Sequence, residues 1–161
     1  MVVRIPMSKA GHTKLRAELT NLERIERMAV IRSIETALEH GDLKENAEYH
    51  AAKERQGHIE GRIMELKDKL GRAEVIDCSA VGTNRVVFGN VVTMSDLNTE
   101  EEVRYQLLGP DEAQVECGSI SVLSPLGQGL IGKSVGDEVE IKTPGGIRLL
   151  EIVDISAPEQ D

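Results

Sequence analysis

An apolar repeat in the first half of the chain constrains the fold more than any other feature of the sequence. Apolar side chains recur at alternating steps of three and four residues from Tyr49 to Leu70, with Gln56 as the one polar member. This spacing is typical of a helix that packs along its length against a second helix. The pattern predicts a helix from Asp42 to about Gly71, with a seam formed by Tyr49, Ala52, Gln56, Ile59, Ile63, Leu66 and Leu70.

The segment before this repeat also has a helical pattern. Between Ser8 and His40 there is no proline, and Gly11 is the single glycine. Apolar residues keep helical spacing in two stretches but change phase between residues 22 and 31, so we expect one long helix with an irregular seam. The two stretches are Leu15, Leu19 and Leu22, and then Ile31, Ile34 and Leu38.

Gly41 separates the two helical patterns. A glycine just past a helix end commonly adopts the left-handed conformation that stops the helix. Two helices of about 30 residues, joined by so short a turn, must fold back on each other as an antiparallel pair about 45 Å long. We expect this pair to be stabilised by its own seam and by the domain at its base.

After Gly71 the pattern changes to short apolar runs separated by turn residues. We expect a small β-rich domain with one short helix between Ser124 and Gly136. The predicted strands are Val86–Val92, Val103–Leu108, Ile120–Leu123, Val139–Lys142 and Gly146–Ile155. The predicted fold class is α+β, with an antiparallel coiled-coil domain at 1–75, a linker at 76–84, the β-rich domain at 85–157 and a tail at 158–161.

The charge of the chain changes at the same place. Residues 1–75 carry 14 Lys and Arg against 13 Asp and Glu, whereas residues 76–161 carry 5 against 15. The acidic second half should be repelled by bare nucleic acid, and a protein with a basic surface is the better-matched partner. The chain has no Trp, one Phe and two Tyr, which disfavours aromatic stacking platforms and aromatic-lined ligand pockets.

The sequence predicts a protein of the reducing cytoplasm with no membrane partner. No apolar run approaches the roughly 18 residues of a membrane-spanning helix, and the first residues lack the hydrophobic stretch of a secretory signal. Cys78 and Cys117 lie far apart and match no disulfide framework or cysteine-based zinc pattern.

The segment His40–Tyr49, between the two helices, carries the residues of most chemical interest. Asp42 followed by Glu45 fits a capping box at the start of the second helix, and on spacing alone this structural role outweighs a catalytic one. The two roles are compatible, because the same carboxylates would stand at the exposed end of a long hairpin. Two carboxylates are too few to hold Mg²⁺ tightly, but they can complete a site whose other ligands come from a partner.

Four stretches of sequence point to a family when taken together. They are IPMSKAGHTKLRAEL at 5–19, EHGDLKENAEYHAAKERQGHIEGRI at 39–63, VIDCSAV with RVVFGNVV within 75–92, and ISVLSPLGQGLIGKSVGDEVEIKTPGG at 120–146. GDLKENAEYHAA is long and specific, unlike a short motif that recurs by chance. Over nearly its whole length, the chain resembles the Gre family of bacterial transcript cleavage factors, most closely the GreA type. The resemblance implies an antiparallel coiled coil followed by an FKBP-like domain.

The resemblance also implies a function that depends on bacterial RNA polymerase. Gre factors insert the hairpin into the secondary channel, where two acids at its end help to bind the catalytic Mg²⁺ and activate water. The polymerase then cleaves the 3′ end of the backtracked nascent RNA and resumes elongation. By position in the motif, the two acids here are Asp42 and Glu45, and Tyr49 matches a tyrosine near them. The isolated chain is then expected to hold no cofactor and to be no enzyme by itself.

Two further sets of residues follow from the same resemblance. Lys44, Lys53 and Arg55 are expected to contact RNA, although solvated surface is the better reading for any lone lysine. Ser124 and Pro125 match the loop that docks on a β′-subunit coiled coil at the channel rim, although a simple turn already explains them. Leu38 occupies a position where the best-known GreA-type pattern has a basic residue. Leu123 occupies a position where related sequences often have Asn or Asp. We expect the chain to act as a monomer.

Two other classes of function remain open. A channel-binding inhibitor without cleavage activity would share the fold and differ at the turn, where the ungapped GDLKEN favours the cleavage role. A prolyl isomerase or chaperone is suggested only by analogy of fold. Phe88 and Tyr105 are the only aromatic residues in that half of the chain, so an apolar proline pocket is poorly supplied.

Overall fold

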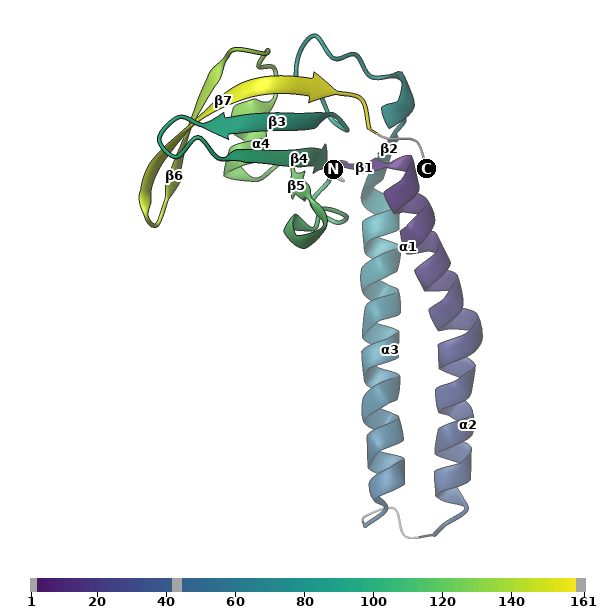
Figure 1. The fold of residues 1–161 in the computed structure, drawn as a ribbon. Helices are drawn as coiled ribbons and strands as arrows, with labels where there is room; N and C mark the ends of the chain where they lie inside the picture. The colour runs from purple at the N-terminus through teal and green to yellow at the C-terminus, as the bar shows by residue number, and fades with distance from the viewer. Residues whose placement is uncertain (1–2, 42–44, 159–161) are drawn as a thin grey trace. The chain divides into compact units, whose positions relative to one another are not determined.

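The computed structural model describes residues 3–41 and 45–158, which form a helical hairpin and a β-rich unit (Figure 1). One compact unit is His12–Arg72, and the other combines the first eleven residues with the chain from Ala73 onward. The domain boundaries predicted from composition stay a prediction. No helix in the described ranges is both long enough and apolar enough to cross a membrane.

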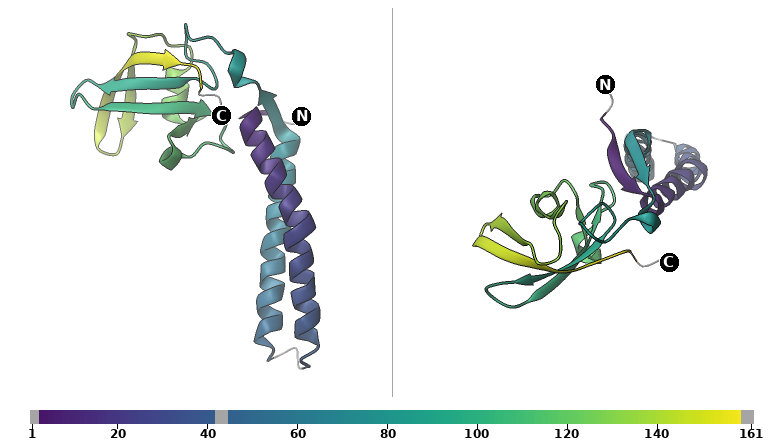
Figure 2. Two further views of the ribbon diagram at one scale, coloured as in Figure 1. Left: turned by 45° about the vertical axis from the view of Figure 1, so that its right-hand side comes forward. Right: turned by 90° about the horizontal axis from the view of Figure 1, so that it is seen from above.

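The predicted hairpin of long helices is confirmed. Its first arm runs from Lys9 to Leu38 and its second arm runs back beside it, as the views in Figures 1 and 2 both show. The elements are α1 (Lys9–Asn21), the π-helix η1 (Leu22–Glu26), α2 (Arg27–Leu38) and α3 (Ala47–Arg72). At 1.5 Å per residue, the first arm is about 45 Å long and α3 is about 39 Å long.

The π-helix explains the irregular seam of the first arm. Leu22 follows Leu15 by seven residues and Ala37 follows Val30 by seven, but Val30 follows Leu22 by eight. A π turn holds one more residue than an α turn, so η1 takes up the extra residue and keeps Leu15, Leu22, Val30 and Ala37 on the face toward α3. The predicted second stretch is therefore wrong in its phase, since Val30 and Ala37 are buried whereas Leu38 is 45% exposed. Ile25 and Met28 are left outside the seam, with exposed fractions of 61% and 45%.

The seam of α3 is buried as its spacing predicts. Ala52, Ile59, Ile63 and Leu66 are buried, and the other three members are half-buried. Charged pairs flank this seam across the two arms: Arg27 to Glu60 at 2.7 Å, Arg62 to Glu18 at 2.8 Å and Arg55 to Glu26 at 2.7 Å. The hydrogen bond from Arg62 lowers the pKa of Glu18, and that from Arg27 lowers the pKa of Glu60.

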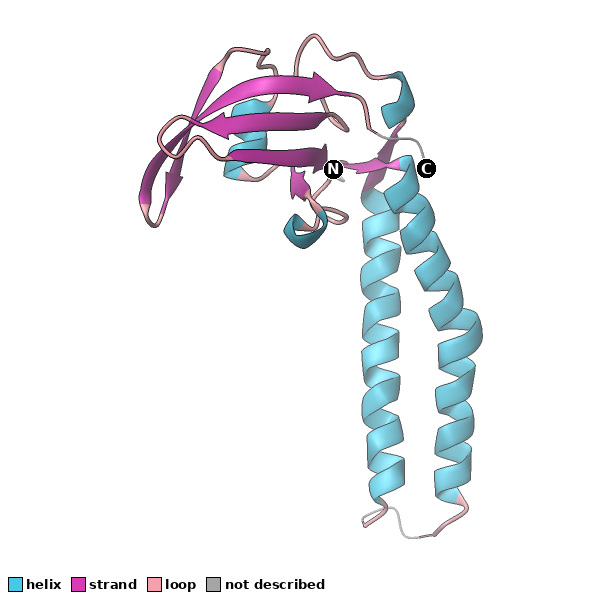
Figure 3. Ribbon diagram, in the orientation of Figure 1, coloured by secondary structure: helices cyan, strands magenta, loops and turns pink. Residues whose placement is uncertain are grey.

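The β-rich unit contains a five-stranded sheet in the order β5-β4-β3-β7-β6 (Figure 3). Its strands are β3 (Val91–Asp96), β4 (Glu102–Leu108), β5 (Ser119–Ser121), β6 (Glu138–Thr143) and β7 (Gly146–Ser156). The short helix α4 (Pro125–Leu130) packs into the core of the sheet through Leu130, which is fully buried. The predicted β-rich domain is therefore confirmed, while its likeness to FKBP domains stays a prediction.

The strand predicted at Val86–Val92 is wrong in its position. The strand begins at Val91, and the residues before it form a loop in which Gly89 has φ +91°. Asn90 is fully buried there, and its side-chain oxygen accepts a hydrogen bond from the Val87 N–H at 2.8 Å. Val86 is also fully buried, so its apolar character reflects burial in a loop rather than an extended strand.

A second, two-stranded sheet was not apparent from the sequence. β1 (Ile5–Ser8) pairs in parallel with β2 (Ala73–Ile76). The Glu112 carboxylate accepts hydrogen bonds from the Ser8 N–H at 2.8 Å, the Ser8 hydroxyl at 2.6 Å and the Gly109 N–H at 3.0 Å. These bonds attach the start of the chain to the β-rich unit. Two short 3₁₀ turns, Cys78–Ala80 and Val115–Cys117, complete the described elements.

Candidate functional site at the hairpin turn

The turn of the hairpin is built differently from the capping box predicted for it. Gly41 has φ +98°, which confirms it as the left-handed stop after α2. However, α3 begins at Ala47, so Glu45 precedes the helix and cannot occupy its third position. The predicted pairing of Asp42 as cap with Glu45 in the first turn is therefore wrong for α3.

Asn46 caps α3 instead. Its side-chain oxygen accepts a hydrogen bond from the Tyr49 N–H at 3.0 Å, which satisfies one of the free donors in the first turn. Its side-chain nitrogen donates to the Ala37 carbonyl oxygen at 2.7 Å. One amide thus caps α3 and bonds the end of α2. Sequence reasoning missed this residue, although Asn immediately before a helical run is a recognised cap signal.

Because Asn46 supplies the cap, Glu45 is released from that role. Glu45 is exposed, and its side chain forms no ion pair or hydrogen bond with another residue in the described ranges. Asp42 and Lys44 lie outside the described residues. Two further acids near the turn, Glu39 and Glu48, are also exposed and add to its negative charge. The Glu48 carboxylate lies 3.8 Å from His40 Nε2.

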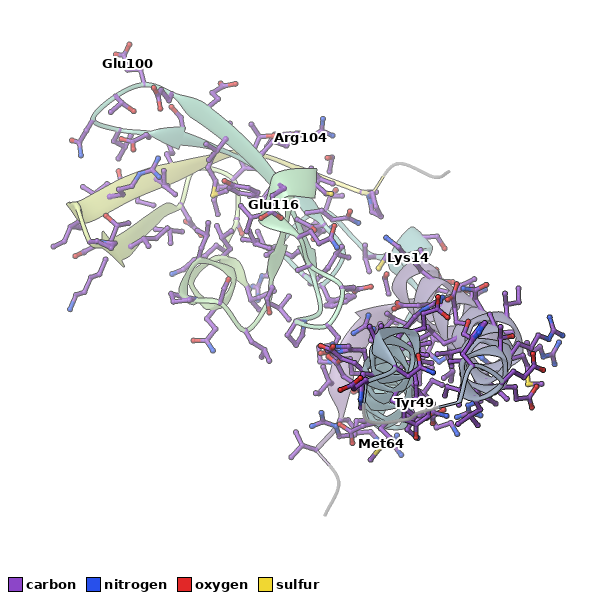
Figure 4. All side chains as sticks on the ribbon, turned by 90° about the horizontal axis from the view of Figure 1, so that it is seen from below. Lys14, Tyr49, Met64, Glu100, Arg104 and Glu116 are labelled. Atoms are coloured by element: carbon purple, nitrogen blue, oxygen red, sulfur yellow. The ribbon has the colours of Figure 1, made fainter. Side chains whose placement is uncertain are left out.

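Tyr49 lies in the first turn of α3, at the end of the hairpin nearest the viewer in Figure 4. Its side chain is half-buried, and its ring packs edge-on against His50 with 5.6 Å between ring centroids. Asn46 links this residue to the turn through the Tyr49 N–H. Glu45 directly precedes the capping residue Asn46, and Tyr49 is hydrogen-bonded to Asn46 through its backbone N–H.

The two predicted RNA contacts in α3 lie farther along the helix. Lys53 is exposed, and its Nζ donates to the Gln56 side chain at 3.1 Å. Arg55 pairs with Glu26 of the first arm rather than facing the turn. Neither residue adjoins Glu45 in sequence, so any joint action with Glu45 would involve a ligand that extends along the hairpin.

Nowhere in residues 3–41 and 45–158 do three His, Cys, Asp or Glu side chains gather in a way that could hold a metal ion. The Glu45 carboxylate, which pairs with no other residue in the described ranges, nevertheless has the chemistry of a Mg²⁺ ligand, because this ion prefers carboxylate oxygens and water. The chain therefore offers a partial donor set at the turn.

Ser124 and Pro125 lie in the β-rich unit at the start of α4. The Ser124 hydroxyl accepts from the Gly127 N–H at 3.1 Å and donates to the Ser121 carbonyl oxygen at 2.6 Å, while Pro125 is the first helical residue. These two residues shape the loop. Leu123, next to them, is 55% exposed.

Comparison with known families decides the identity of the chain. Residues 5–75 match the model of the transcription elongation factor N-terminal domain, and residues 81–157 match that of the GreA/GreB C-terminal domain. The chain belongs to the GreA/GreB family of transcription elongation factors.

Relatives in the GreA/GreB family are similar over almost the full chain. A transcription elongation factor GreA of Desulfotalea psychrophila is 65% identical over 155 residues, which are 96% of each chain. A GreA of Thermodesulfovibrio yellowstonii is 54% identical, covering 97% of this chain and 99% of its own. Among solved structures, the GreA factor homolog 1 of Thermus thermophilus matches 96% of this chain and 99% of its own, at 29% identity and a TM-score of 0.44.

Proposed function

We propose that this chain rescues arrested transcription by stimulating RNA cleavage within bacterial RNA polymerase. The hairpin enters the secondary channel, and Asp42 and Glu45 reach the active centre. The observation that carries the proposal is the exposed carboxylate of Glu45, which has no partner among the described residues and is not needed as a helix cap, because Asn46 caps α3. GreA-type relatives at up to 65% identity support the assignment to elongation.

The shape of the hairpin supports delivery of these acids. Its arms are about 39–45 Å long and only one helix pair thick, so the turn can reach a site deep inside a partner. The flanking ion pairs and the apolar seam keep the arms together, and the Asn46–Ala37 hydrogen bond closes them at the turn. The carboxylate of Glu45 is thereby presented on a preformed support, which reduces the entropy lost on binding.

The chemistry requires a cation that the polymerase holds. When bound, Mg²⁺ lowers the pKa of a coordinated water and stabilises charge on the cleaved phosphodiester. Asp42 and Glu45 would supply carboxylate oxygens to complete its coordination, and Asn46 would keep Glu45 outside the helix. Tyr49 would contact the RNA beside these acids.

The β-rich unit is assigned the docking role. Its residues carry most of the net negative charge of the chain. The complementary partner is therefore a protein with a basic surface, located at the channel rim. Ser124 and Pro125 shape the docking loop, and the exposed Leu123 adds apolar contact. The β′ coiled coil at this rim is the proposed partner.

A cleavage assay on a stalled, backtracked polymerase complex tests the proposal. Asp42→Asn combined with Glu45→Gln should leave polymerase binding within about twofold and reduce cleavage stimulation at least about a hundredfold, since both carboxylates are lost while the surface is kept. Glu35→Gln is the matched control, because Glu35 is an exposed acid of α2 without a partner among the described residues. Full stimulation by the double variant would overturn the mechanism.

The same assay separates the alternative function. A channel-binding inhibitor would compete for the polymerase and release no short 3′ fragments from the stalled complex. Binding by the wild-type chain without such fragments, at saturating Mg²⁺, would therefore favour inhibition over cleavage.

A further inference from the structure

The outer side of the first arm carries a patch of two arginines and two apolar residues, here called the outer patch: Arg24, Ile25, Met28 and Arg32. Met28 and Arg32 each lie two residues from the fully buried Val30, which is slightly more than half a helical turn. Arg24 and Ile25 lie one turn before Met28. All four side chains are exposed, so the outer patch faces away from α3.

The π-helix η1 is the reason that this patch faces outward. Without its extra residue, the seam would continue from Leu22 to Ala29, and Arg32 would lie nearly one full turn from the seam, close to α3. With η1 the seam passes through Val30, and Arg32 is turned to the outside beside Met28. Single π turns inside α-helices are rare and frequently lie at functional sites.

The charges of the outer patch are not neutralised as those along α3 are. On α3, several cations pair with acids three or four residues away: Arg62 with Glu65, Lys69 with Glu65, and Arg72 with Asp68, at 2.8 to 3.1 Å. The acids beside the outer patch, Glu23 and Glu26, pair instead with bases of α3. Arg24 and Arg32 form no ion pair or side-chain hydrogen bond with any residue in the described ranges.

This arrangement matches an acidic protein surface better than a nucleic acid. Arg24 and Arg32 are eight residues apart, about 12 Å along the helix, and each guanidinium can hold a carboxylate through two hydrogen bonds. Ile25 and Met28 occupy the interval, with exposed fractions of 61% and 45%. Methionine and arginine are enriched in protein interfaces, whereas a phosphate backbone would offer Met28 no apolar contact.

We infer that the outer patch docks on an acidic protein surface of RNA polymerase, with carboxylates on Arg24 and Arg32 and an aliphatic side chain on Met28. The inference rests on the proposed function, which brings the hairpin into the polymerase. The β-rich unit is acidic and needs a basic surface, so the two contacts cannot be exchanged. The outer patch would therefore set the orientation of the hairpin about its own long axis.

The affinity of the full-length chain for its cognate core RNA polymerase tests the inference. The dissociation constant is measured on immobilised polymerase in about 0.1 M KCl, where distant exposed charges are largely screened. Arg24→Gln combined with Arg32→Gln should raise this constant about tenfold, because two charge-assisted contacts are lost.

Lys14→Gln combined with Arg16→Gln is the matched control. Lys14 and Arg16 are exposed cations of the same arm, lie outside the outer patch, and form no ion pair in the described ranges. The control removes the same net charge and should change the dissociation constant less than about twofold. Equal weakening by the two double variants would show a general effect of charge and would overturn the inference.

Met28→Ala separates a protein surface from a nucleic acid. It should raise the dissociation constant for polymerase about threefold because an apolar contact is lost, and the helix is kept since alanine favours it. Unchanged binding by this variant would overturn the docking on protein. Loss of affinity for a single-stranded oligoadenylate in the double arginine variant, with polymerase binding unchanged, would assign the outer patch to nucleic acid.

Failure of this inference can be told apart from failure of the proposed function. If the double arginine variant binds polymerase as the wild type does, while the wild type stimulates cleavage, only the inference fails. If the double arginine variant binds weakly but the Asp42 and Glu45 double variant still stimulates cleavage fully, only the cleavage mechanism fails. If the wild-type chain does not bind polymerase, both fail together.

Discussion

The helical hairpin and the β-rich unit reach their folds by different balances of forces. In the β-rich unit a single apolar cluster joins ten buried residues. In the described part of the hairpin, the buried residues Leu15, Val30, Ala37, Ala52, Ile59, Ile63 and Leu66 are strung along the arms, and Val30, Ile59 and Ile63 form a small cluster with two half-buried leucines. The hairpin adds cross-arm ion pairs, which are partly exposed to solvent and contribute only about 0–1 kcal/mol each. An element that must be long and thin cannot build a deep core, so its stability should be lower and more sensitive to pH and salt.

The largest effect is expected in the core of the β-rich unit. Leu107 is fully buried there, and Leu107→Ala should cost about 2–5 kcal/mol because it leaves a cavity that the sheet cannot fill. Amide hydrogen exchange, read residue by residue, should lose protection across β3, β4 and β7. Unchanged protection in these strands would show that the unit does not depend on this single core.

A smaller effect is expected from the same kind of change in the hairpin. Ile63 is 2% exposed, and Ile63→Ala should cost about 2–3 kcal/mol, near the lower end of the usual range, because a one-layer seam can relax around the cavity. Exchange protection should fall along α3. A cost greater than that of Leu107→Ala would reverse the comparison between the two regions.

The cap of α3 gives the next effect in size. Asn46→Ala removes both the cap to Tyr49 and the bond to Ala37, and it should cost about 0.5–2 kcal/mol of hairpin stability. Thermal unfolding followed by far-ultraviolet circular dichroism measures it. Asn21→Ala is the matched control, because Asn21 is exposed within the first arm and makes no side-chain cap, so the melting temperature should stay the same or rise slightly.

Acid should weaken the hairpin by a modest amount. The pKa values of Glu18 and Glu60 are lowered mainly by hydrogen bonds from Arg62 and Arg27, and that of Glu65 mainly by one from Lys69. A lowered folded-state pKa gives stabilisation that is fully present above the unfolded value of about 4.5 and is lost as pH falls through the folded value. Exchange protection in α3, corrected for intrinsic rates, should therefore fall between pH 5 and pH 3.

The β-rich unit provides a test of how specific this acid effect is. The pKa of Asp96 is lowered as well, first by the Asn98 N–H and then by Arg148, so this unit also loses some stability in acid. Because its main core is apolar, the fractional loss should be smaller than in the hairpin. Adding 1 M NaCl at pH 7 should likewise weaken the hairpin more, since salt screens exposed pairs.

Most of the hairpin could be predicted from the sequence, because helical spacing and helix-ending residues are apparent within short stretches of the chain. Steps of three and four residues place the seam of α3, and Gly41 marks the end of α2. The sequence also shows the change of phase within the first arm. It does not show that a π turn accommodates this change, because that depends on where Val30 and Ala37 pack against α3. That contact is tertiary, so the spacing alone did not determine it.

The parts that sequence could not predict depend on long-range partners. β1 forms because Ile5–Ser8 pairs with Ala73–Ile76. The Ser8 N–H also donates a hydrogen bond to Glu112, more than a hundred residues away in the sequence. At the candidate site, the acidic residues are apparent from the sequence and the resemblance implies their role, but the spacing predicts a cap at Asp42 where the structure has one at Asn46. Asp42 and Asn46 are both good capping residues, and only the start of α3 at Ala47 distinguishes their roles.

The parallel pairing of β1 with β2 joins the two chain segments from which the arms of the hairpin emerge. Separating the arms at that end would first require breaking a sheet whose edge residue, Ser8, is held by the Glu112 carboxylate. At the opposite end the short turn and the Asn46–Ala37 hydrogen bond also hold the arms together. The hairpin is therefore tied at both ends, so thermal loosening of the arms should be greatest midway along them.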